Sequence, residues 1–403
     1  MKTKALIIGG GMAGLSLGLL LAQAGLDTVL VDTDKVQKLS EVAPSGRTVA
    51  LMAPSINVLK ACGVWARIAP MATRMAAMRL IDDTRTPPVK VLFPAGEAGL
   101  SEFGYNIPND QLRAALVECV QEQQNLTYIA PARLQSYEIT ASGVRALIDN
   151  GEIIEAEVLI GCDGRKSPVR EGAGITVKTH DYGQQAITFL ISHSKDHENI
   201  STEHHRAGGP FTFVPLRGKQ SSVVWVEKTD DAKELLAMPR QAFERTLQDR
   251  SHGLLGAIKL ESAPQSWPLV WLQADKLTAP RTAIAAEAAH VLSPIGAQGL
   301  NLSLRDVAAL AETLVDAARL GEDIGSPPVL ERYAARRSLD LETRVRGVDL
   351  YNRAVANDIG FIGTLRRFGL ISLDKIPALR ALAMRQGLLP ALDNPRILQG
   401  GAL

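Results

Sequence analysis

The 403-residue sequence predicts an α/β fold, α+β overall, in three parts: a discontinuous α/β domain, an inserted β-sheet lobe and a helical C-terminal tail. Three observations predict it. The chain opens on an apolar run, a glycine-rich turn and an Ala/Leu-rich segment; strand-like segments dominate its middle; and segments rich in Arg and Leu fill its end. We expect the first domain to comprise residues 1–175 and 276–330, the lobe 176–275, and the tail 331–403.

The opening segment carries the strongest pattern. Apolar Ala5–Ile8 leads into Gly9-Gly10-Gly11-Met12-Ala13-Gly14, a helix-like segment follows, and a second apolar run ends on Asp32. This order is that of a Rossmann-like unit, which binds the adenosine diphosphate half of a dinucleotide. The helix N-terminus offers N–H groups to phosphates, and the acid accepts hydrogen bonds from ribose hydroxyls. The candidate cofactor residues here are Gly9, Gly11, Met12, Ala13, Gly14 and Asp32.

The same segment has a second interpretation. Ala5 to Leu26 contain no charged residue and follow Lys2 and Lys4, as in a signal peptide or membrane anchor. Six glycines in that stretch argue against a continuous apolar helix, and no small-residue cleavage pattern follows. We therefore expect a cytoplasmic protein.

Charge and cysteine content exclude other classes. The formal net charge is +1, from 44 Lys and Arg against 43 Asp and Glu, so we expect no nucleic-acid partner. The three cysteines are scattered, which predicts neither a disulfide framework nor a metal site. His204-His205 is the only histidine cluster, and it reads as a solvated loop rather than as metal ligands.

Local patterns predict the remaining elements in order. Ser45 to Trp65 read as a loop and then a helix, residues 76–104 as short strands, and Asn109 to Gln123 as an amphipathic helix. A β-meander over 136–148 returns to a strand at Glu157–Gly161. Residues 180–275 are rich in strands, 282–317 return to a strand–loop–helix pattern, and 331–389 are helical.

Two later motifs indicate which dinucleotide is bound. An apolar strand, Val158–Gly161, ends at Asp163-Gly164, and a second strand, Thr282–Ala285, ends at Glu287. A Pro/Gly loop after the second strand enters another helix near Asn301. An extended flavin needs both of these features. The carboxylate binds its ribityl hydroxyls, and the oriented N–H groups of the helix N-terminus lie beside its ring and stabilise the anionic reduced form.

These residues together resemble the class A flavin-dependent aromatic hydroxylases, and more closely the ubiquinone-biosynthesis hydroxylase family. The resemblance covers essentially the whole chain. It rests on the GxGxxG turn, on a GxDGxxSxVR segment that runs from Gly161 to Arg170, and on the segment from Ala288-Ala289-His290 to Asp306. It implies that FAD is also contacted by Arg47, Asn109, Asp163, Gly164, Glu287, Pro294, Ala297, Gly299, Leu300 and Asn301.

The resemblance also implies an activity. NAD(P)H would reduce FAD, and one atom of O₂ would be transferred to the ring of a polyprenylated phenol on the route to ubiquinone. No metal is implied, and the flavin, rather than a catalytic side chain, carries the chemistry. A lipid-soluble substrate implies an apolar pocket, and peripheral contact with the inner face of the membrane or with other proteins of the pathway. Assembly into a homo-oligomer is open.

Two rival functions remain open at this point. One is a flavin hydroxylase of a soluble aromatic acid, which would need an inward-facing Arg/Tyr carboxylate clamp. The other is a non-catalytic subunit with a decayed flavin site, because the family's Gly-Asp is Ala286-Glu287 here and Ala297 replaces a glycine. We expect Glu287 to reach the ribityl chain nonetheless, since it keeps the carboxylate.

Some single residues have two interpretations. His290 is a packing residue or an acid or base, and Asp163 is a flavin-site residue or a helix cap. Trp225 and Phe213 belong to the core of the lobe or stack on a ring. Arg366-Arg367, beside apolar residues in the tail, form a solvated helix face or meet a membrane or partner.

Overall fold

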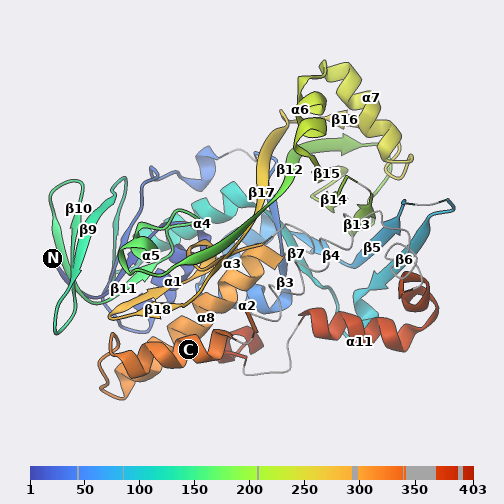
Figure 1. The fold of residues 1–403 in the computed structure, drawn as a ribbon. Coiled ribbons are helices and arrows are strands. Elements are labelled where there is room, and N and C mark those ends of the chain that lie inside the picture. The colour runs from blue at the N-terminus through green and yellow to red at the C-terminus, as the bar shows by residue number, and fades with distance from the viewer. Residues whose placement is uncertain are drawn as a thin grey trace.

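The computed structural model describes residues 1–42, 45–84, 86–206, 208–292, 298–338, 340–341, 369–388 and 394–403. Within these ranges the strands form three sheets, of eight, nine and three strands. Figure 1 shows the first sheet and its helices as one body, from which long strands lead to a second lobe with a helix pair at its far end. This mixed α/β architecture confirms the predicted fold class.

The first sheet is built on the predicted opening unit. β1 (Lys2–Ile8) lies between β2 (Thr28–Val31) and β11 (Ile153–Gly161), and β8 (Leu126–Ile129) and β19 (Thr282–Ile284) extend the parallel array. A sheet of this kind is covered on both faces, which is why its strands read as continuous apolar runs. The side chains of β1 from Ala5 to Ile8 are accordingly buried.

Three helices pack together beside this sheet (Figure 1). They are α1 (Met12–Gln23), α4 (Asn109–Glu122) and α8 (Gln298–Arg319). The structure confirms the predicted helix after the glycine turn and the predicted amphipathic helix. It also confirms the β-meander, formed by β9 (Leu134–Ile139), β10 (Val144–Ile148) and β11.

The predicted loop after Ser45 is partly wrong. β3 (Thr48–Met52) pairs antiparallel with β7 (Gly104–Pro108), which also pairs with β4 (Thr73–Met75). The Thr-Val-Ala-Leu run is apolar and partly β-branched, so it forms a strand once β7 supplies backbone partners. The predicted helix follows directly as α2 (Ala53–Ala61).

The second sheet forms the lobe around a 17-residue strand, β12 (Val177–His193). β12 pairs antiparallel with β15 (Gln220–Lys228) and β17 (Gln265–Ala274), and β15 continues to β14 (Phe211–Pro215). Trp225 and Phe213 are almost fully buried in one cluster with Phe243 of the lobe's second helix. They are therefore core residues and do not stack on a bound ring.

Two strands from the N-terminal half complete this sheet. β13 (Ile200–His205) pairs parallel with β5 (Ala77–Asp82), which pairs with β6 (Val89–Pro94). The expected division placed residues 77–94 in the first domain, whereas their strands belong to the second sheet. No local pattern could show this, because the pairing joins segments far apart in sequence.

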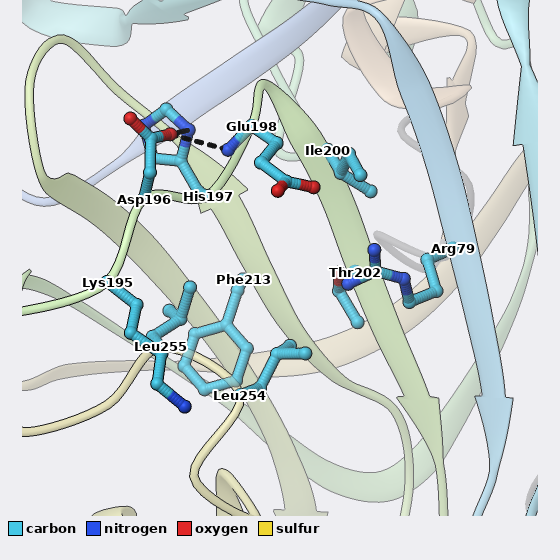
Figure 2. A pocket seen from close by; sticks show the side chains of 10 residues that line it. All are labelled: Arg79, Lys195, Asp196, His197, Glu198, Ile200, Thr202, Phe213, Leu254 and Leu255. Atoms are coloured by element: carbon cyan, nitrogen blue, oxygen red, sulfur yellow. Dashed lines mark hydrogen bonds and ion pairs between the residues drawn. The ribbon is translucent and has the colours of Figure 1, made fainter.

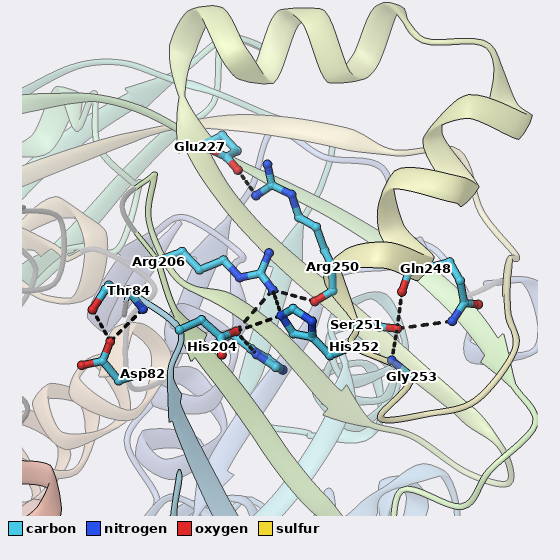
Figure 3. Close-up of polar contacts among 11 residues, drawn as sticks. Asp82, Thr84, His204, Arg206, Glu227, Gln248, Arg250, Ser251, His252 and Gly253 are labelled. Carbon is cyan, nitrogen blue, oxygen red and sulfur yellow. Dashed lines mark hydrogen bonds and ion pairs between the residues drawn. The ribbon is translucent and has the colours of Figure 1, made fainter. Parts of the chain in front are cut away.

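A polar network joins the ends of β5 and β13 (Figure 3). Asp83 Oδ2 lies 2.7 Å from His204 Nδ1 and 3.3 Å from Arg206 Nη2, and Arg206 donates to the backbone oxygen of Arg250 at 2.6 Å. The interpretation of His204-His205 as a solvated loop is therefore wrong. Both side chains are about 1% exposed on β13, and one nitrogen of each ring lies beside a carboxylate: Asp83 for His204 and Glu203, at 2.9 Å, for His205.

The remaining helices and strands are shorter or peripheral. Their bounds are α3 (Trp65–Ile68), α5 (Pro168–Gly172), α6 (Thr229–Ala237), α7 (Arg240–Arg250), α11 (Pro377–Leu388), β16 (Ile258–Leu260), β18 (Thr278–Ala279) and β20 (His290–Val291), with 3₁₀ turns η1 (Leu39–Glu41), η2 (Ala69–Met71), η3 (Ala95–Ala98), η4 (Ala286–Ala288) and η6 (Arg396–Gln399). α6 and α7 cover the outer face of the lobe sheet (Figure 1).

The predicted helical tail is described only in part. α11 packs against η3, and Arg380 donates to both carboxylate oxygens of Glu97 at 2.6 Å each. Arg366 and Arg367 lie outside the described residues. Among the helices that the structure describes, none combines the length and the apolar composition needed to cross a lipid bilayer.

Candidate functional site

The glycines of the opening turn serve two different purposes. Gly9 has φ +108°, and a Cβ there would lie 2.3 Å from the carbonyl oxygen of Cys162; a Cβ at Gly14 would lie 1.9 Å from that of Gly9. These two glycines let α1 pack against the sheet. A Cβ at Gly11 would meet nothing within 4 Å in the described structure, and no side chain caps α1 there. The first N–H groups of α1 therefore have no side-chain cap, which leaves them available to an anion.

Asp32 ends β2 with its side chain fixed in place. Arg113 Nη2 donates to Asp32 Oδ2 at 2.5 Å, and the Tyr128 hydroxyl donates to the same oxygen at 3.2 Å. A Cβ at Gly10 would lie 2.4 Å from that oxygen, so this glycine is also needed. No sequence pattern pointed to Tyr128. Arg113 was detectable only as a lone cation on the predicted helix from Asn109 to Gln123.

Asp163 caps α5, and its role in flavin binding stays a prediction. Its Oδ2 accepts the Val169 N–H at 3.0 Å, as a cap on α5. Its Oδ1 is buried and has no hydrogen-bond partner among the described residues, so a ligand can satisfy it. Burial raises the pKa of Asp163. Gly164 follows in the left-handed region, at φ +83°.

Arg170 joins the second and third motifs. It is 4% exposed and donates at 2.9 Å to the backbone oxygens of both Ala288 and Arg165. Arg165 Nε in turn lies 3.6 Å from Glu287 Oε2. Glu287 itself is exposed on η4. The two loops that carry Asp163 and Glu287, the carboxylates predicted to bind the flavin, are thus held together.

A buried charge cluster lies behind Glu287. Asp306 Oδ2 lies 2.6 Å from His290 Nε2 and accepts the Ala286 N–H at 3.0 Å, while Oδ1 accepts from Arg337 Nε at 2.7 Å. Burial alone would raise the pKa of Asp306, but His290, Arg337 and the Ala286 N–H together lower it to about 2. His290 is 3% exposed and fully engaged, so it is a packing residue and not an acid or base.

Ala286 adopts a left-handed backbone, with φ +58°, that favours glycine. We predict that Ala286→Gly destabilises the protein less than Ala288→Gly does. The difference between the two losses of stability should be about 1–2 kcal/mol, which is the cost of a left-handed alanine. Both changes delete a buried methyl and add the same chain entropy, so the difference isolates the backbone. Urea denaturation of both variants measures it. Equal losses of stability would show that the left-handed turn is unstrained.

The N-terminus of α8 is built into its surroundings. The Asn301 amide oxygen accepts from the Met52 N–H at 2.9 Å and from Ser55 Oγ at 2.7 Å, and its nitrogen donates to the Ala50 carbonyl at 2.7 Å. The Asn301 side chain thus joins α8 to β3 and α2. A Cβ at Gly299 would meet nothing within 4 Å of the described atoms. Leu300 is half-buried, and Pro294 and Ala297 lie outside the described residues.

A cavity of about 200 Å³ lies between these loops and the inner face of the lobe sheet. Arg47 lies over the Trp267 ring across it, 4.6 Å from the ring centre. The Asn109 amide oxygen is buried there with no partner in the described structure. The cavity is lined by Arg47, Thr48, Asn109, Arg165 and Glu287 on the nucleotide side, and by Ala186, Thr188, Val224, Trp267, Pro268, Leu269, Val270, Val291 and Leu292 on the other.

A second cavity, of about 350 Å³, lies on the opposite face of the lobe sheet (Figure 2). Its lining includes Phe213, Leu254 and Leu255 and the charged side chains of Arg79, Lys195, Asp196 and Glu198. None of the predicted cofactor residues lines it. We therefore infer that the functional site includes the smaller cavity, which Arg47, Asn109 and Glu287 line.

The glycine turn, the two carboxylates that follow parallel strands and the cleft against an inserted sheet define a two-lobed, dinucleotide-binding flavoprotein. Comparison identifies the family. A model described as FAD binding domain matches residues 2–346 of the chain. The chain belongs to this family and is an FAD-dependent monooxygenase, which confirms the resemblance noted from its motifs.

Curated relatives cover nearly the whole chain. It is 33% identical over 398 residues to the ubiquinone hydroxylase UbiL of Rhodospirillum rubrum, covering 98% of this chain and 92% of that protein. It is 30% identical over 387 residues to the 3-demethoxyubiquinol 3-hydroxylase of Escherichia coli, covering 96% of this chain and 98% of that protein.

Solved structures share the fold. PqsL, a probable FAD-dependent monooxygenase from Pseudomonas aeruginosa, superposes with a TM-score of 0.76 at 22% identity, covering 92% of this chain and 100% of that one. The p-nitrophenol 4-monooxygenase PnpA from Pseudomonas putida superposes with a TM-score of 0.78 at 18% identity, covering 97% of this chain and 100% of that one. At these identities the likeness is evidence for the fold alone.

Proposed function

We propose that the protein hydroxylates the aromatic ring of a polyprenylated phenol on the route to ubiquinone, with FAD as cofactor and NAD(P)H and O₂ as co-substrates. The observation that carries the proposal is the cleft between the nucleotide side and the lobe sheet. The names of the two curated relatives, a ubiquinone hydroxylase and a demethoxyubiquinol hydroxylase, support the substrate class.

The residues present fit FAD. We propose that Gly11, Met12 and Ala13 at the N-terminus of α1 hold the pyrophosphate and that Asp32 holds the ribose hydroxyls. Asp163 Oδ1, which lacks a protein partner in the described structure, and the Glu287 carboxylate supply acceptors for the ribityl chain. When bound, FAD supplies the redox chemistry, in which one atom of O₂ enters the ring and the other leaves as water. Arg47, Asn109, Gly164, Gly299, Leu300 and the backbone of Asn301 complete the proposed set.

The protein's part is to place the ring and keep it dry. The lobe wall of the cleft is apolar apart from Thr188 and the Trp267 N–H. The apolar side chains of this wall, such as Leu269 and Val270, are suited to contact with an aromatic ring and its prenyl chain. Arg47 and Arg165 line the nucleotide side of the cleft, and no arginine or tyrosine is among the described residues of the lobe wall. The names of the curated relatives, rather than the cleft lining, support a phenol over a soluble aromatic acid.

The test is mass spectrometry of quinone lipids in a strain that lacks this protein. We expect a polyprenylphenol short of one ring oxygen to accumulate, and plasmid-borne protein to restore the ubiquinone pool. An unchanged pool in a strain that lacks its other flavin hydroxylases as well would contradict the proposal. If the purified protein is colourless and takes up no added FAD, it is instead a non-catalytic subunit.

We also propose peripheral contact with a membrane surface through α11. Leu379 and Leu382 of α11 are 41% and 53% exposed, and their spacing of three residues places them on one side of the helix; Ile376, directly before α11, is 49% exposed. Arg380 and Met384 are buried on the other side. Sedimentation with anionic lipid vesicles tests this, with Leu379→Glu and Leu382→Glu combined expected to weaken binding. Unchanged sedimentation of that variant would exclude α11 as the contact.

A further inference from the structure

One buried hydroxyl in the cleft has no partner. Thr188 is 8% exposed on β12, and its Oγ1 makes no hydrogen bond within the described part of the chain. Its neighbours across the sheet are Val224 on β15 and Gln265 on β17, in backbone register. Burying an unsatisfied hydroxyl costs about 1–3 kcal/mol, and valine would fill the same space without that cost. Threonine at this position therefore makes the fold less stable than valine would, and in exchange it places a polar atom in the cleft.

The hydroxyl faces the place where we have put the ring. Thr188 lines the cleft together with Ala186 and Leu269, and no other side-chain hydroxyl lines the lobe wall among the described residues. A phenol that enters this apolar wall must satisfy its own oxygen, because an unpaired buried polar group is costly. The unpartnered Thr188 hydroxyl and the phenolic oxygen are complementary, since each both donates and accepts a hydrogen bond.

We propose that the Thr188 hydroxyl binds the phenolic oxygen of the substrate and so fixes which ring carbon is presented for oxygenation. This rests on the proposed function, whose substrate is a phenol. Thr188 is well suited to such positioning because a β-branched side chain has few rotamers and a central strand is rigid. It acts as a specificity-determining residue: a site built around a hydrogen bond rejects the analogue that lacks the hydroxyl.

The test compares two ligands on the FAD-loaded protein: 2-geranylphenol and geranylbenzene, which lacks the ring oxygen. Thr188→Val should weaken 2-geranylphenol binding by about tenfold, which corresponds to one lost hydrogen bond, and should not weaken geranylbenzene binding. Thr188→Ser, which keeps the hydroxyl, should retain most of the preference for the phenol. Dissociation constants come from the change in flavin absorbance on titration.

Two further readouts separate this role from a structural one. Thr188→Val should melt at the same temperature as the wild type or higher, because the hydroxyl has no protein partner to lose. It should also form less hydroxylated product per NAD(P)H consumed, since the ring is held less well. Thr212→Val, on β14 and opposite Val224 but outside the cleft lining, is the matched control and should change neither ligand's affinity.

The outcomes distinguish the two proposals. If Thr188→Val binds 2-geranylphenol as tightly as the wild type, or loses affinity for both ligands equally, the role of Thr188 is overturned while the function stands. If the wild-type holoprotein binds neither ligand, the polyprenylphenol substrate class is overturned, and the role of Thr188 with it.

Discussion

Replacing Asp306 with alanine is expected to lower the free energy of unfolding by about 3–5 kcal/mol, the usual cost of removing one partner from a buried ion pair. The change leaves the His290 ring without its carboxylate, and it leaves the Arg337 guanidinium, 3% exposed, with Asp340 as its remaining carboxylate partner. It also removes the acceptor of the Ala286 N–H, which holds the left-handed turn before Glu287. Urea denaturation of the apoprotein measures the loss.

The matched control lies on the same helix. Asp316 pairs with Arg396 at 2.8 Å, but both side chains are more than 40% exposed, so Asp316→Ala should cost at most about 1 kcal/mol. If the two variants are equally stable, the buried cluster contributes no more than a surface pair. If Asp306→Ala is the less stable of the two variants, its affinity for FAD should fall as well, because η4 loses the carboxylate that accepts the Ala286 N–H.

The same carboxylate predicts a pH dependence. Its pKa is lowered from 3.8 to about 2 in the folded protein. A group with a depressed folded-state pKa stabilises the fold above its unfolded pKa, and this contribution disappears as the pH falls through the folded value. The wild type should therefore lose stability between about pH 4 and pH 2, and Asp306→Ala should lose correspondingly less in that range.

Replacing Gly11 with alanine is expected to leave the fold intact and to weaken FAD binding by roughly 10- to 100-fold, the equivalent of one or two hydrogen bonds to a charged group. Gly11 has φ −70° and ψ 174°, which alanine adopts freely, and its Cβ would meet nothing within 4 Å of the described atoms. The methyl would stand where the N–H groups of α1 face the proposed pyrophosphate. Fluorescence titration of the apoprotein with FAD measures the affinity.

Gly14→Ala is the contrasting variant. Its Cβ would lie 1.9 Å from the Gly9 carbonyl oxygen, so α1 must move away from the sheet and the apoprotein itself should be destabilised. Circular dichroism and thermal melting of both apoproteins separate the two effects. Wild-type FAD affinity in a folded Gly11→Ala protein would show that the pyrophosphate does not approach this glycine.

Local patterns predicted most of what lies in the first domain. β1, α1 and β2 follow from one apolar run, one glycine turn and another apolar run, because a parallel strand covered on both faces leaves a continuous apolar signature. The carboxylates Asp163 and Glu287 were found in the same way, each directly after such a strand. Their backbone positions are fixed by the strand ends, so a short motif is sufficient to locate them.

The partners of those carboxylates could not be predicted. Arg113 reaches Asp32 from another helix, and Arg337 reaches Asp306 from the start of the tail. β5 pairs with β13 across more than a hundred residues of chain, which moves residues 77–94 into the lobe sheet. Such contacts leave no periodic trace, since each depends on where two distant segments meet in the folded chain.

The amino-acid sequence by itself determined the class of this protein: a glycine turn, two strand-end carboxylates and their order along the chain specify where an FAD molecule would lie. Only the tertiary structure decided which side chains are available to a ligand. It shows that the side chains of His290 and Asn301 are hydrogen-bonded to other protein groups, and that the Thr188 hydroxyl is buried without a partner among the described residues. The reason is physical: backbone turns are set by neighbours in sequence, whereas the hydrogen-bonding state of a side chain is set by neighbours in space.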